Sequence, residues 1–316
     1  MTTLSFVELI TEHRLLLLIT FIFTWISFKL SQLLLIYLKY TVGKWCFSKR
    51  KTLRKAGEWA VVTGASSGIG EAYAEELAKE SLNIMLISND EEQLSCVANR
   101  IANIYNVQTR FVVADFTKND VYEIIKPTIE QLSTIACLVN NVGMGLPFEL
   151  FAGEVNSPNE ETIRNIIHCN ILSAVTMTSI ILPKMLTQKE PNPGIINIAS
   201  YSALRVTPYL TVYSSTKSAI IQFSRCLAAE KYQKNVNIQT LCPLTIYTPM
   251  TKNEKPSFFT PTAKLYAKCS LDMYGVEQQS TGYIHHELKA YLFNLLPTFL
   301  WIFITYTRVK SRKKNL

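Results

Sequence analysis

The chain has 316 residues, enough for one large domain or two small ones. Its hydrophobic fraction is 48%, and the longest apolar segments lie near the two ends. The net charge of +8 comes largely from basic clusters beside these ends. Such clusters indicate contact with a membrane surface and argue against nucleic acid as a partner.

The seven cysteines stand at positions 46, 96, 137, 169, 226, 242 and 269, and none forms a C-x-x-C pair. An odd number of widely spaced cysteines predicts reduced thiols on the cytosolic side, with neither a disulfide framework nor a metal site. His285 and His286 are adjacent, and on a strand they would point to opposite faces, so we expect no shared metal.

An apolar segment from Leu15 to Leu38 predicts a membrane anchor, since about 24 residues can cross a hydrocarbon core of about 30 Å. Lys29 interrupts it near the middle. A signal peptide is the alternative, but the strong positive charge, Lys44 to Lys55, follows the apolar run instead of preceding it. We assign residues 1–57 to an anchor and basic linker, and the positive-inside rule places the next domain in the cytosol.

We expect residues 58–289 to form a single α/β domain with a Rossmann-type doubly wound parallel sheet. Short apolar runs of the kind found in buried strands alternate with gaps long enough for helices, which favours a parallel sheet covered on both faces. The expected strands are 59–63, 82–88, 109–115, 135–140, 194–200 and 236–242, and residues 282–285 are a candidate for a closing strand.

The remaining segments are less regular. Residues 249–281 contain Pro256 and Pro261 and have no clear strand period, so we expect a lid over a substrate site. Residues 290–316 begin with a second apolar stretch, 290–306, which includes Pro297 and fits a membrane-lying or re-entrant helix as well as a crossing. Lys313 and Lys314 have the spacing of a dilysine signal for the endoplasmic reticulum, and a solvated basic tail is the alternative.

Two patterns point to chemistry. The run from Gly64 through Gly68 to Gly70 lies between a strand and a helical pattern, and such a glycine turn lets backbone N–H groups approach a pyrophosphate. Tyr213 and Lys217 have helical spacing and can act on one site. A phenol titrates near pH 10 unless a cation favours the phenolate, and Lys217 is placed to be that cation.

Together with Asn140 to Gly143, Asn170 and Ser200, these motifs resemble the short-chain dehydrogenase/reductase family over about residues 58–248. Within it, Asn140 to Met144, Asn170 to Ser173 and the apolar ends are similar to membrane-bound 17β-hydroxysteroid dehydrogenases and very-long-chain 3-oxoacyl-CoA reductases. The stretches 258–261 and 281–284 are most similar to a nematode-type steroid dehydrogenase branch.

The resemblance implies a catalytic tetrad. Ser200 would bind the substrate carbonyl, and Tyr213 would protonate it as hydride arrives from the nicotinamide. Lys217 would bind the nicotinamide ribose and lower the pKa of Tyr213, and Asn170 would hold a water that connects Lys217 to solvent. The residues expected to contact the cofactor are Gly64, Ser66, Ser67, Gly68, Ile69, Gly70, Ser88, Asn89, Asp115, Asn141, Gly143, Tyr213, Lys217 and Thr248.

Two positions depart from the family pattern. Asn89 stands where near relatives carry an arginine, but Ser88 provides no acid to repel a 2′-phosphate, so we expect NADP(H) ahead of NAD(H). Leu244 stands where the family has glycine, which predicts crowding or a shifted backbone near the nicotinamide.

The expected function is hydride transfer between NADP(H) and a ketone or secondary alcohol on a lipid, a steroid or a long-chain 3-oxoacyl-CoA. A retinol or other lipid-alcohol dehydrogenase and a catalytically idle dinucleotide-binding scaffold are the alternatives. We expect an endoplasmic reticulum membrane protein with its catalytic domain facing the cytosol, and family members suggest a homodimer through the helices that carry Asn170 and Tyr213.

Overall fold

The computed structural model of the protein describes residues 2–145, 148–153, 157–230, 236–251 and 255–314, and the side chains of 2–12, 308 and 310–314 lie outside this description. The chain forms two compact units, Met1–Cys46 and Phe47–Leu316. The first consists of α1 (Thr2–Leu38), a π-helical turn η1 (Lys39–Gly43) and most of α2 (Lys44–Phe47).

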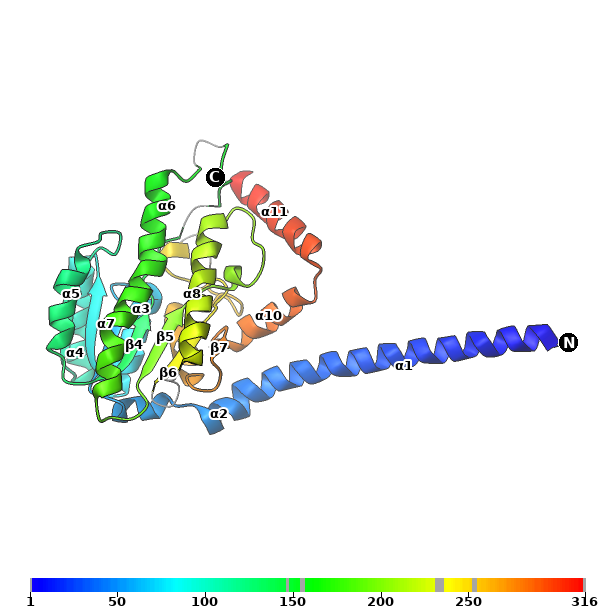
Figure 1. Ribbon diagram of the computed structural model, residues 1–316, viewed down its shortest axis with the longest axis horizontal. Helices are drawn as coiled ribbons and strands as arrows, with labels where there is room; N and C mark the ends of the chain where they lie inside the picture. Colours follow the sequence, from blue (N-terminus) through cyan, green and yellow to red (C-terminus); the bar gives the residue numbers. More distant parts are fainter. Residues whose placement is uncertain (1, 146–147, 154–156, 231–235, 252–254, 315–316) are drawn as a thin grey trace. The chain divides into compact units, whose positions relative to one another are not determined.

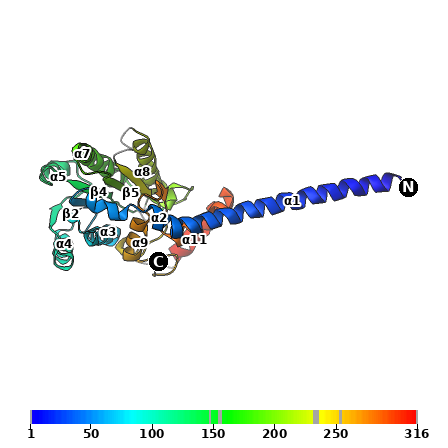
Figure 2. The same ribbon diagram turned by 90° about the horizontal axis from the view of Figure 1, so that it is seen from below.

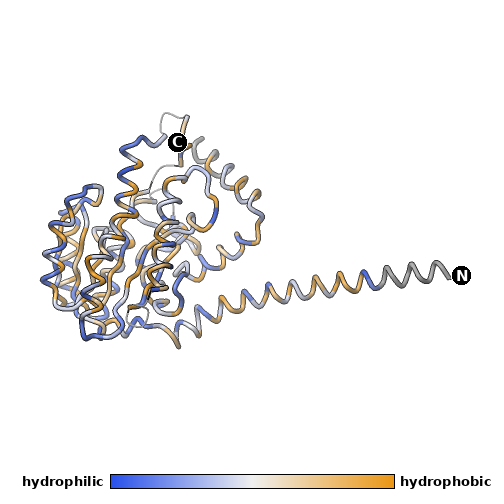
Figure 3. Tube along the Cα trace, viewed as in Figure 1, coloured by the Kyte–Doolittle hydropathy of each residue, from blue (hydrophilic) through white to orange (hydrophobic). Residues whose placement is uncertain are grey.

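Helix α1 has the length and composition of the anchor that the sequence predicted. Apolar residues recur along it from residue 13 onward (Figure 3), and it is apolar enough to cross a membrane. Phe21 and Leu35 are among its large side chains that are well over half exposed. The Lys29 ammonium lies 5.7 Å from the Phe28 ring and 5.9 Å from the Trp25 ring, contacts that reduce the cost of a cation in apolar surroundings.

The second unit is built around the parallel sheet that the sequence predicted. Its seven strands are β1 (Trp59–Thr63), β2 (Asn83–Ser88), β3 (Thr109–Val113), β4 (Ile135–Asn140), β5 (Gly194–Ile198), β6 (Asn237–Leu241) and β7 (Gln279–Ser280). They run parallel in the order β3-β2-β1-β4-β5-β6-β7, so the direction of winding reverses between β1 and β4. This reversal makes the sheet doubly wound.

Helices cover both faces of the sheet (Figures 1 and 2). One layer contains α3 (Gly68–Lys79), α4 (Glu91–Tyr105) and α9 (Ala263–Asp272); the other contains α5 (Val121–Glu130), α6 (Glu160–Ile167), the π-helical turn η3 (His168–Leu172), α7 (Ser173–Thr187) and α8 (Thr211–Ala229). Each layer has its own apolar core against the sheet. Strands β1, β4 and β5 are buried along their whole length, as strands covered on both faces must be.

A buried polar ladder connects two of these helices through the sheet. The Asn140 amide of β4 donates to Thr178 Oγ1 of α7 at 3.0 Å and to Asn197 Oδ1 of β5 at 2.8 Å. The Asn197 amide in turn donates to Ser224 Oγ of α8 at 2.8 Å. Because buried donors need partners, this ladder fixes α7 and α8 relative to the strands between them.

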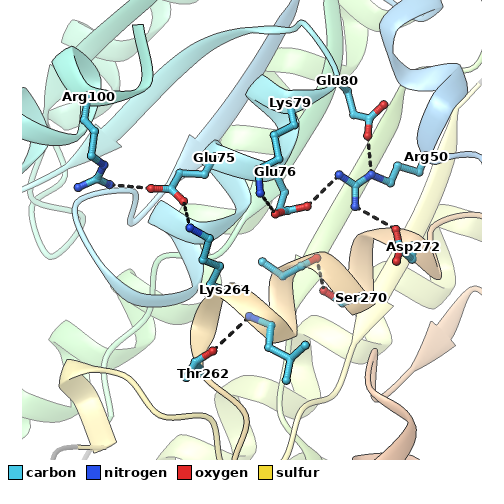
Figure 4. A network of polar contacts seen from close by, with 12 residues as sticks. Arg50, Glu75, Glu76, Lys79, Glu80, Arg100, Thr262, Lys264, Ser270 and Asp272 are labelled. Atoms are coloured by element: carbon cyan, nitrogen blue, oxygen red, sulfur yellow. Dashed lines mark hydrogen bonds and ion pairs between the residues drawn. The ribbon is translucent and has the colours of Figure 1, made fainter. Parts of the chain in front are cut away.

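The basic linker expected before residue 58 belongs to the body from Phe47 onward. Leu53 and Ala56 are fully buried, and the Lys49 N–H donates to the Tyr274 carbonyl at 2.8 Å. Arg50, in the 3₁₀ turn η2 (Arg50–Lys55), contacts three carboxylates, those of Glu76, Glu80 and Asp272, at 2.8, 2.6 and 2.9 Å (Figure 4). Arg50 therefore joins α3 to α9 and is not a cation held free for lipid.

The candidate closing strand at residues 282–285 is wrong. The edge strand is β7, just before it, and Gly282 then turns with a φ of +77° so that Ile284 can begin α10 (Ile284–Asn294). The Glu287 carboxylate accepts hydrogen bonds from the Thr281 N–H and hydroxyl at 3.1 and 2.7 Å, which stabilises this start. His285 and His286 are thus neighbours on a helix, not on a strand.

The expected lid is also shorter than 249–281. Within that range, α9 packs against α3, and its Tyr266, Ala267 and Leu271 are fully buried. Helix α9 is therefore part of the packed body and not of a lid. Among the described residues of the segment, 249–251 form the 3₁₀ turn η6 (Pro249–Thr251), and 255–262 contain the largely exposed Phe258.

The second apolar segment forms two helices, α10 and α11 (Thr298–Lys314), which meet at a bend of 116°. Their inner side packs on the loop that follows β5: the Trp301 indole donates to the Val206 carbonyl at 2.8 Å, and Arg205 donates to the Leu296 carbonyl at 2.9 Å. Apolar residues recur along the pair in Figure 3, and Phe299 and Phe303 are more than 60% exposed.

Candidate active site

The predicted glycine turn follows β1 at the carboxyl edge of the sheet. Gly64 has a φ of +64°, and a Cβ there would lie 2.9 Å from both the Asn141 amide nitrogen and the Val142 Cα. A Cβ on Gly70 would lie 2.1 Å from the Gly64 carbonyl oxygen. Both positions therefore exclude a side chain, which keeps the turn tight against the strand and the next helix.

Asn141 holds this turn in place. Its amide donates to the Thr63 and Gly64 carbonyls at 3.0 and 3.2 Å, while the Asn141 and Val142 N–H groups donate to Thr63 Oγ1 at 3.0 and 3.1 Å. The loops after β1 and β4 are thereby locked together. Asn141, predicted as a cofactor residue, thus has a supporting position behind the turn.

Helix α3 begins at the open side of the turn. Ser67 is extended at the N-cap position, and its side chain makes no capping hydrogen bond with the described first turn. Gly68 has a φ of +62°, and a Cβ there would lie 3.5 Å from Thr248. Ser67, Gly68 and Thr248 line a cleft of about 810 Å³, and Ile69 packs into the core. The N-terminus of α3 can therefore accept an anionic group.

The other predicted contacts lie at the ends of β2 and β3. Ser88 is buried, with its hydroxyl 2.8 Å from that of Ser66, and Asn89 beside it is exposed. Asp115 Oδ1 accepts from both the N–H and the hydroxyl of Thr117, at 3.0 and 2.8 Å. The Asp115 side chain thus stabilises its own turn, which leaves its other oxygen for a ligand.

Three members of the predicted tetrad meet at the carboxyl ends of β5 and β4. Tyr213 and Lys217 lie on α8, and the Lys217 ammonium is 6.0 Å from the centre of the Tyr213 ring. Lys217 is 4% exposed and donates to the Ile198 carbonyl at 2.9 Å. Ser200, just beyond β5, makes a hydrogen bond with the Tyr213 hydroxyl.

Asn170 lies in η3, where the helix widens into a π-helical turn of the kind that often marks functional sites. Its amide contacts the Met144 backbone twice, accepting from N–H at 2.6 Å and donating to the carbonyl at 3.0 Å, and also donates to Thr216 Oγ1. A Cβ on Gly143 would lie 3.2 Å from both Asn170 Oδ1 and the Lys217 ammonium. Asn170, Gly143 and Lys217 therefore form one contiguous group.

Burial shifts both titrating groups of the pair. Removal from water raises the pKa of Tyr213, and the hydrogen bond with Ser200 opposes this rise. Burial lowers the pKa of Lys217 to about 8. In the protein without a nucleotide, Tyr213 is therefore a protonated acid at neutral pH, and its expected acidification by Lys217 stays a prediction for the nucleotide-bound form.

The sequence did not reveal the support behind Ser200. The neighbouring Tyr201 donates through its hydroxyl to Asn294 at 3.0 Å, and its N–H donates to the Pro243 carbonyl at 2.9 Å. Ser202 is a further polar neighbour, with its hydroxyl 3.0 Å from that of Ser200. Contacts between segments so far apart along the chain have no local signature, so sequence patterns alone could not reveal them.

Comparison with known proteins agrees with this geometry. The model of the short chain dehydrogenase family matches residues 58–257. The very-long-chain 3-oxoacyl-CoA reductase of Mus musculus is 36% identical, with 86% of this chain and 88% of the mouse protein covered. The human 17-beta-hydroxysteroid dehydrogenase type 3 is 40% identical, with 82% of this chain and 81% of the human protein covered.

Solved structures share the fold. A 7beta-hydroxysteroid dehydrogenase has a TM-score of 0.64 at 21% identity, with 72% of this chain and 88% of that one covered. A short-chain dehydrogenase from Sphingobium yanoikuyae in complex with NADPH has a TM-score of 0.60 at 22% identity, covering 67% and 82%. The family and the Rossmann-type fold expected from the motifs are confirmed, and this oxidoreductase chain belongs to the short-chain dehydrogenase family.

Proposed function

We propose that this protein reduces a ketone on a lipid substrate, a steroid or a long-chain 3-oxoacyl-CoA, with NADPH as the hydride donor. The observation that carries the proposal is the group formed by Ser200, Tyr213 and Lys217. The Tyr213 phenol is protonated and hydrogen-bonded to the Ser200 hydroxyl, and the buried Lys217 ammonium lies beside its ring. This arrangement can give a proton to a carbonyl oxygen.

The residues present fit a dinucleotide. The glycine turn leaves backbone N–H groups at the start of α3 for a pyrophosphate, and Gly143 has no side chain that would cover Lys217 and Asn170. In this proposal, the residues that contact the dinucleotide between its adenosine and nicotinamide ends are Gly64, Ser66, Ser67, Gly68, Ser88, Asp115 and Thr248. When bound, NADPH supplies the hydride.

The chain's own residues then handle the carbonyl oxygen and its proton. Ser200 donates a hydrogen bond to the oxygen and orients it toward Tyr213. Tyr213 gives its proton as negative charge develops on that oxygen, and Lys217 stabilises the phenolate left behind. Asn170, together with its contacts to Met144 and Thr216, holds the π-helical turn beside Lys217, where a water can return the proton from solvent.

Ser88 supports NADP(H) over NAD(H). A carboxylate at the end of β2 would bind the ribose 2′-OH and repel a 2′-phosphate. Ser88 is neutral, and its hydroxyl is hydrogen-bonded to that of Ser66. Ser88→Asp should therefore weaken NADPH binding far more than NADH binding. Equal loss for both cofactors would contradict this part of the proposal.

The apolar surfaces support a lipid substrate and a membrane location. Helix α1 has the length of a span, and Phe299 and Phe303 expose apolar area on the pair that packs beside the Ser200 loop. We further propose an endoplasmic reticulum location with the body in the cytosol, a cover formed by residues 249–251 and 255–262, and a homodimer through α6–η3–α7 and α8. The Lys313 and Lys314 side chains lie outside the described residues.

The test uses the full chain in detergent micelles and follows NADPH oxidation with ketosteroids and long-chain 3-oxoacyl-CoA substrates, with NADH in parallel. Tyr213→Phe should lower kcat by about 10² to 10⁴ while NADPH still binds. Tyr105→Phe, which alters a tyrosine at the end of α4, is the matched control. Failure of the wild type to turn over any of these ketones, or full activity in Tyr213→Phe, would reject the proposal.

A further inference from the structure

His286 is a buried histidine outside the catalytic group, fully enclosed on the inner side of α10. Both ring nitrogens contact the backbone: Nδ1 is 3.3 Å from the Leu244 amide nitrogen, and Nε2 is 3.3 Å from the Phe259 carbonyl oxygen. The rings of Tyr266 and Tyr283 lie against it, with centroids at 6.1 and 5.3 Å. One side chain thus connects two segments that are distant in sequence.

These two contacts fix the chemical form of the ring. An amide N–H can only donate, so Nδ1 must accept from Leu244; a carbonyl can only accept, so Nε2 must carry the hydrogen that goes to Phe259. Only the neutral tautomer with hydrogen on Nε2 satisfies both. Burial lowers the pKa of His286 to about 4, so the ring stays neutral throughout the physiological range.

The first tethered segment is hydrogen-bonded to the Ser200 loop, and the second belongs to the cover in the proposed function. Leu244 follows β6 in the position where the family has glycine, and its φ is not positive, so the backbone there needs no glycine. The preceding carbonyl, of Pro243, accepts from the N–H of Tyr201, the residue after Ser200. Phe259 lies in the segment 255–262, before α9. One backbone hydrogen bond, from Tyr201 to Pro243, and the two hydrogen bonds of the His286 ring thus connect the Ser200 loop through Leu244 to Phe259.

We propose that His286 is a positioning residue that holds the turn after β6 against the segment 255–262, and so fixes the distance between the nicotinamide side and the substrate side of the site. The ring acts through Leu244 and Phe259 and touches no reacting atom. This role rests on the proposed ketone reduction, but the tether itself is a property of the protein alone.

Three substitutions of His286 remove its two hydrogen bonds singly or together. His286→Asn keeps an acceptor near Nδ1 but has no group that reaches Phe259, whereas His286→Gln keeps a donor near Nε2. His286→Phe keeps the ring volume and loses both bonds. Hydrogen exchange in the full chain, followed by mass spectrometry, reports on the amides of 243–247 and 255–262 separately.

We expect His286→Phe to speed exchange in both segments, His286→Asn mainly in 255–262, and His286→Gln mainly in 243–247. With NADPH and a ketone substrate, His286→Phe should lower kcat/KM by about 10-fold to 100-fold, with smaller losses in the other two variants. The dissociation constant of NADPH should change less than kcat/KM, because the two His286 hydrogen bonds go to Leu244 and Phe259 and not to the glycine turn.

If both segments of His286→Phe exchange at the rate of the wild type, the proposal is overturned. The same loss of protection throughout the body in all three variants would also overturn it. The exchange pattern does not depend on turnover. If the wild type reduces no ketone but the three variants still show separate patterns, the proposed function fails and the tether remains. If turnover is normal in every variant, the positioning role fails and the function remains.

Discussion

Lys217 and Arg50 are both cations withdrawn from solvent, but their surroundings differ completely. Lys217 is 4% exposed and donates to the Ile198 carbonyl, and in the described part of the chain no carboxylate forms an ion pair with it. Arg50 has a side chain 13% exposed and contacts three carboxylates. Burial lowers the pKa of Lys217, whereas for Arg50 the hydrogen bonds to Glu80 and Glu76 outweigh burial and raise it.

The difference separates a site from a structural joint. A cation with all its partners holds elements together, and its charge is fully used by the fold. A cation without an anionic partner destabilises the fold, and such a group persists where its charge acts on a ligand. The two regions should therefore respond to substitution in opposite ways.

The largest expected effect is that of Lys217→Met. The lysine pKa falls from 10.5 to about 8, which corresponds to a cost of roughly 3 kcal/mol for keeping the charge buried at neutral pH. Removing the charge should lower kcat for ketone reduction by about 10² to 10⁴ and raise the free energy of unfolding by about 1 to 3 kcal/mol. Steady-state kinetics and denaturant unfolding in detergent measure the two. A lower free energy of unfolding in Lys217→Met would contradict the proposed difference between the two cations.

Arg50→Met should do the reverse. Among the described residues it leaves Glu76, which is 2% exposed, with Lys79 as its remaining ionic partner, and it removes the Arg50 ion pairs of Glu80 and Asp272. We expect a loss of about 3 kcal/mol in the free energy of unfolding, while kcat per folded molecule stays unchanged. Arg50→Lys is the control, since it keeps the charge without the planar fork and should lose less. A lower kcat in folded Arg50→Met would mean that Arg50 also contributes to catalysis.

Alkaline titration gives a smaller and more specific effect. Between pH 8 and 10.5 the folded protein has released the Lys217 proton while the unfolded chain still holds it. The unfolding free energy contributed by this group should therefore rise with pH in that window, by up to about 1.4 kcal/mol per pH unit, and be constant below pH 8, where both states hold the proton. Subtracting the pH profile of Lys217→Met from that of the wild type isolates this slope, and a flat difference would contradict the buried charge.

The smallest expected effect is at a surface pair. Arg164 and Glu160 form an ion pair at 2.7 Å on α6, with side chains 63% and 88% exposed. Arg164→Ala should change the free energy of unfolding by no more than about 0.5 kcal/mol, because solvent screens the pair. The same denaturation measurement applies, and a loss as large as that of Arg50→Met would mean that exposure does not decide the value of these pairs.

The sequence predicted the parts of the fold that local patterns determine. The apolar runs at 59–63 and 135–140 lie in strands because they are buried on both faces, and Gly64 and Gly70 are required by contacts with immediate neighbours in the turn. Tyr213 and Lys217 share a helix face through spacing alone. These features need no knowledge of distant residues.

The parts that were missed depend on contacts between distant segments. The positive charge of 44–55 suggested a lipid surface, and nothing near Arg50 in sequence points to Glu76 or Asp272 as partners. Residues 282–285 were a candidate for a closing strand, but Gly282 and the Thr281–Glu287 hydrogen bonds start a helix there. His286 was visible in the sequence, yet its role follows only from Leu244 and Phe259, which approach it in the folded chain.

The packing of α10 and α11 on the loop after Ser200 has a consequence for synthesis. Asn294, Leu296 and Trp301, which hold Tyr201, Arg205 and Val206, leave the ribosome more than 90 residues after the loop that they hold. The sheet and the glycine turn can form on the nascent chain, since their residues emerge earlier. The Ser200 loop can reach its final arrangement only after α10 and α11 have emerged, so the growing chain can acquire a nucleotide site before it acquires a competent catalytic centre.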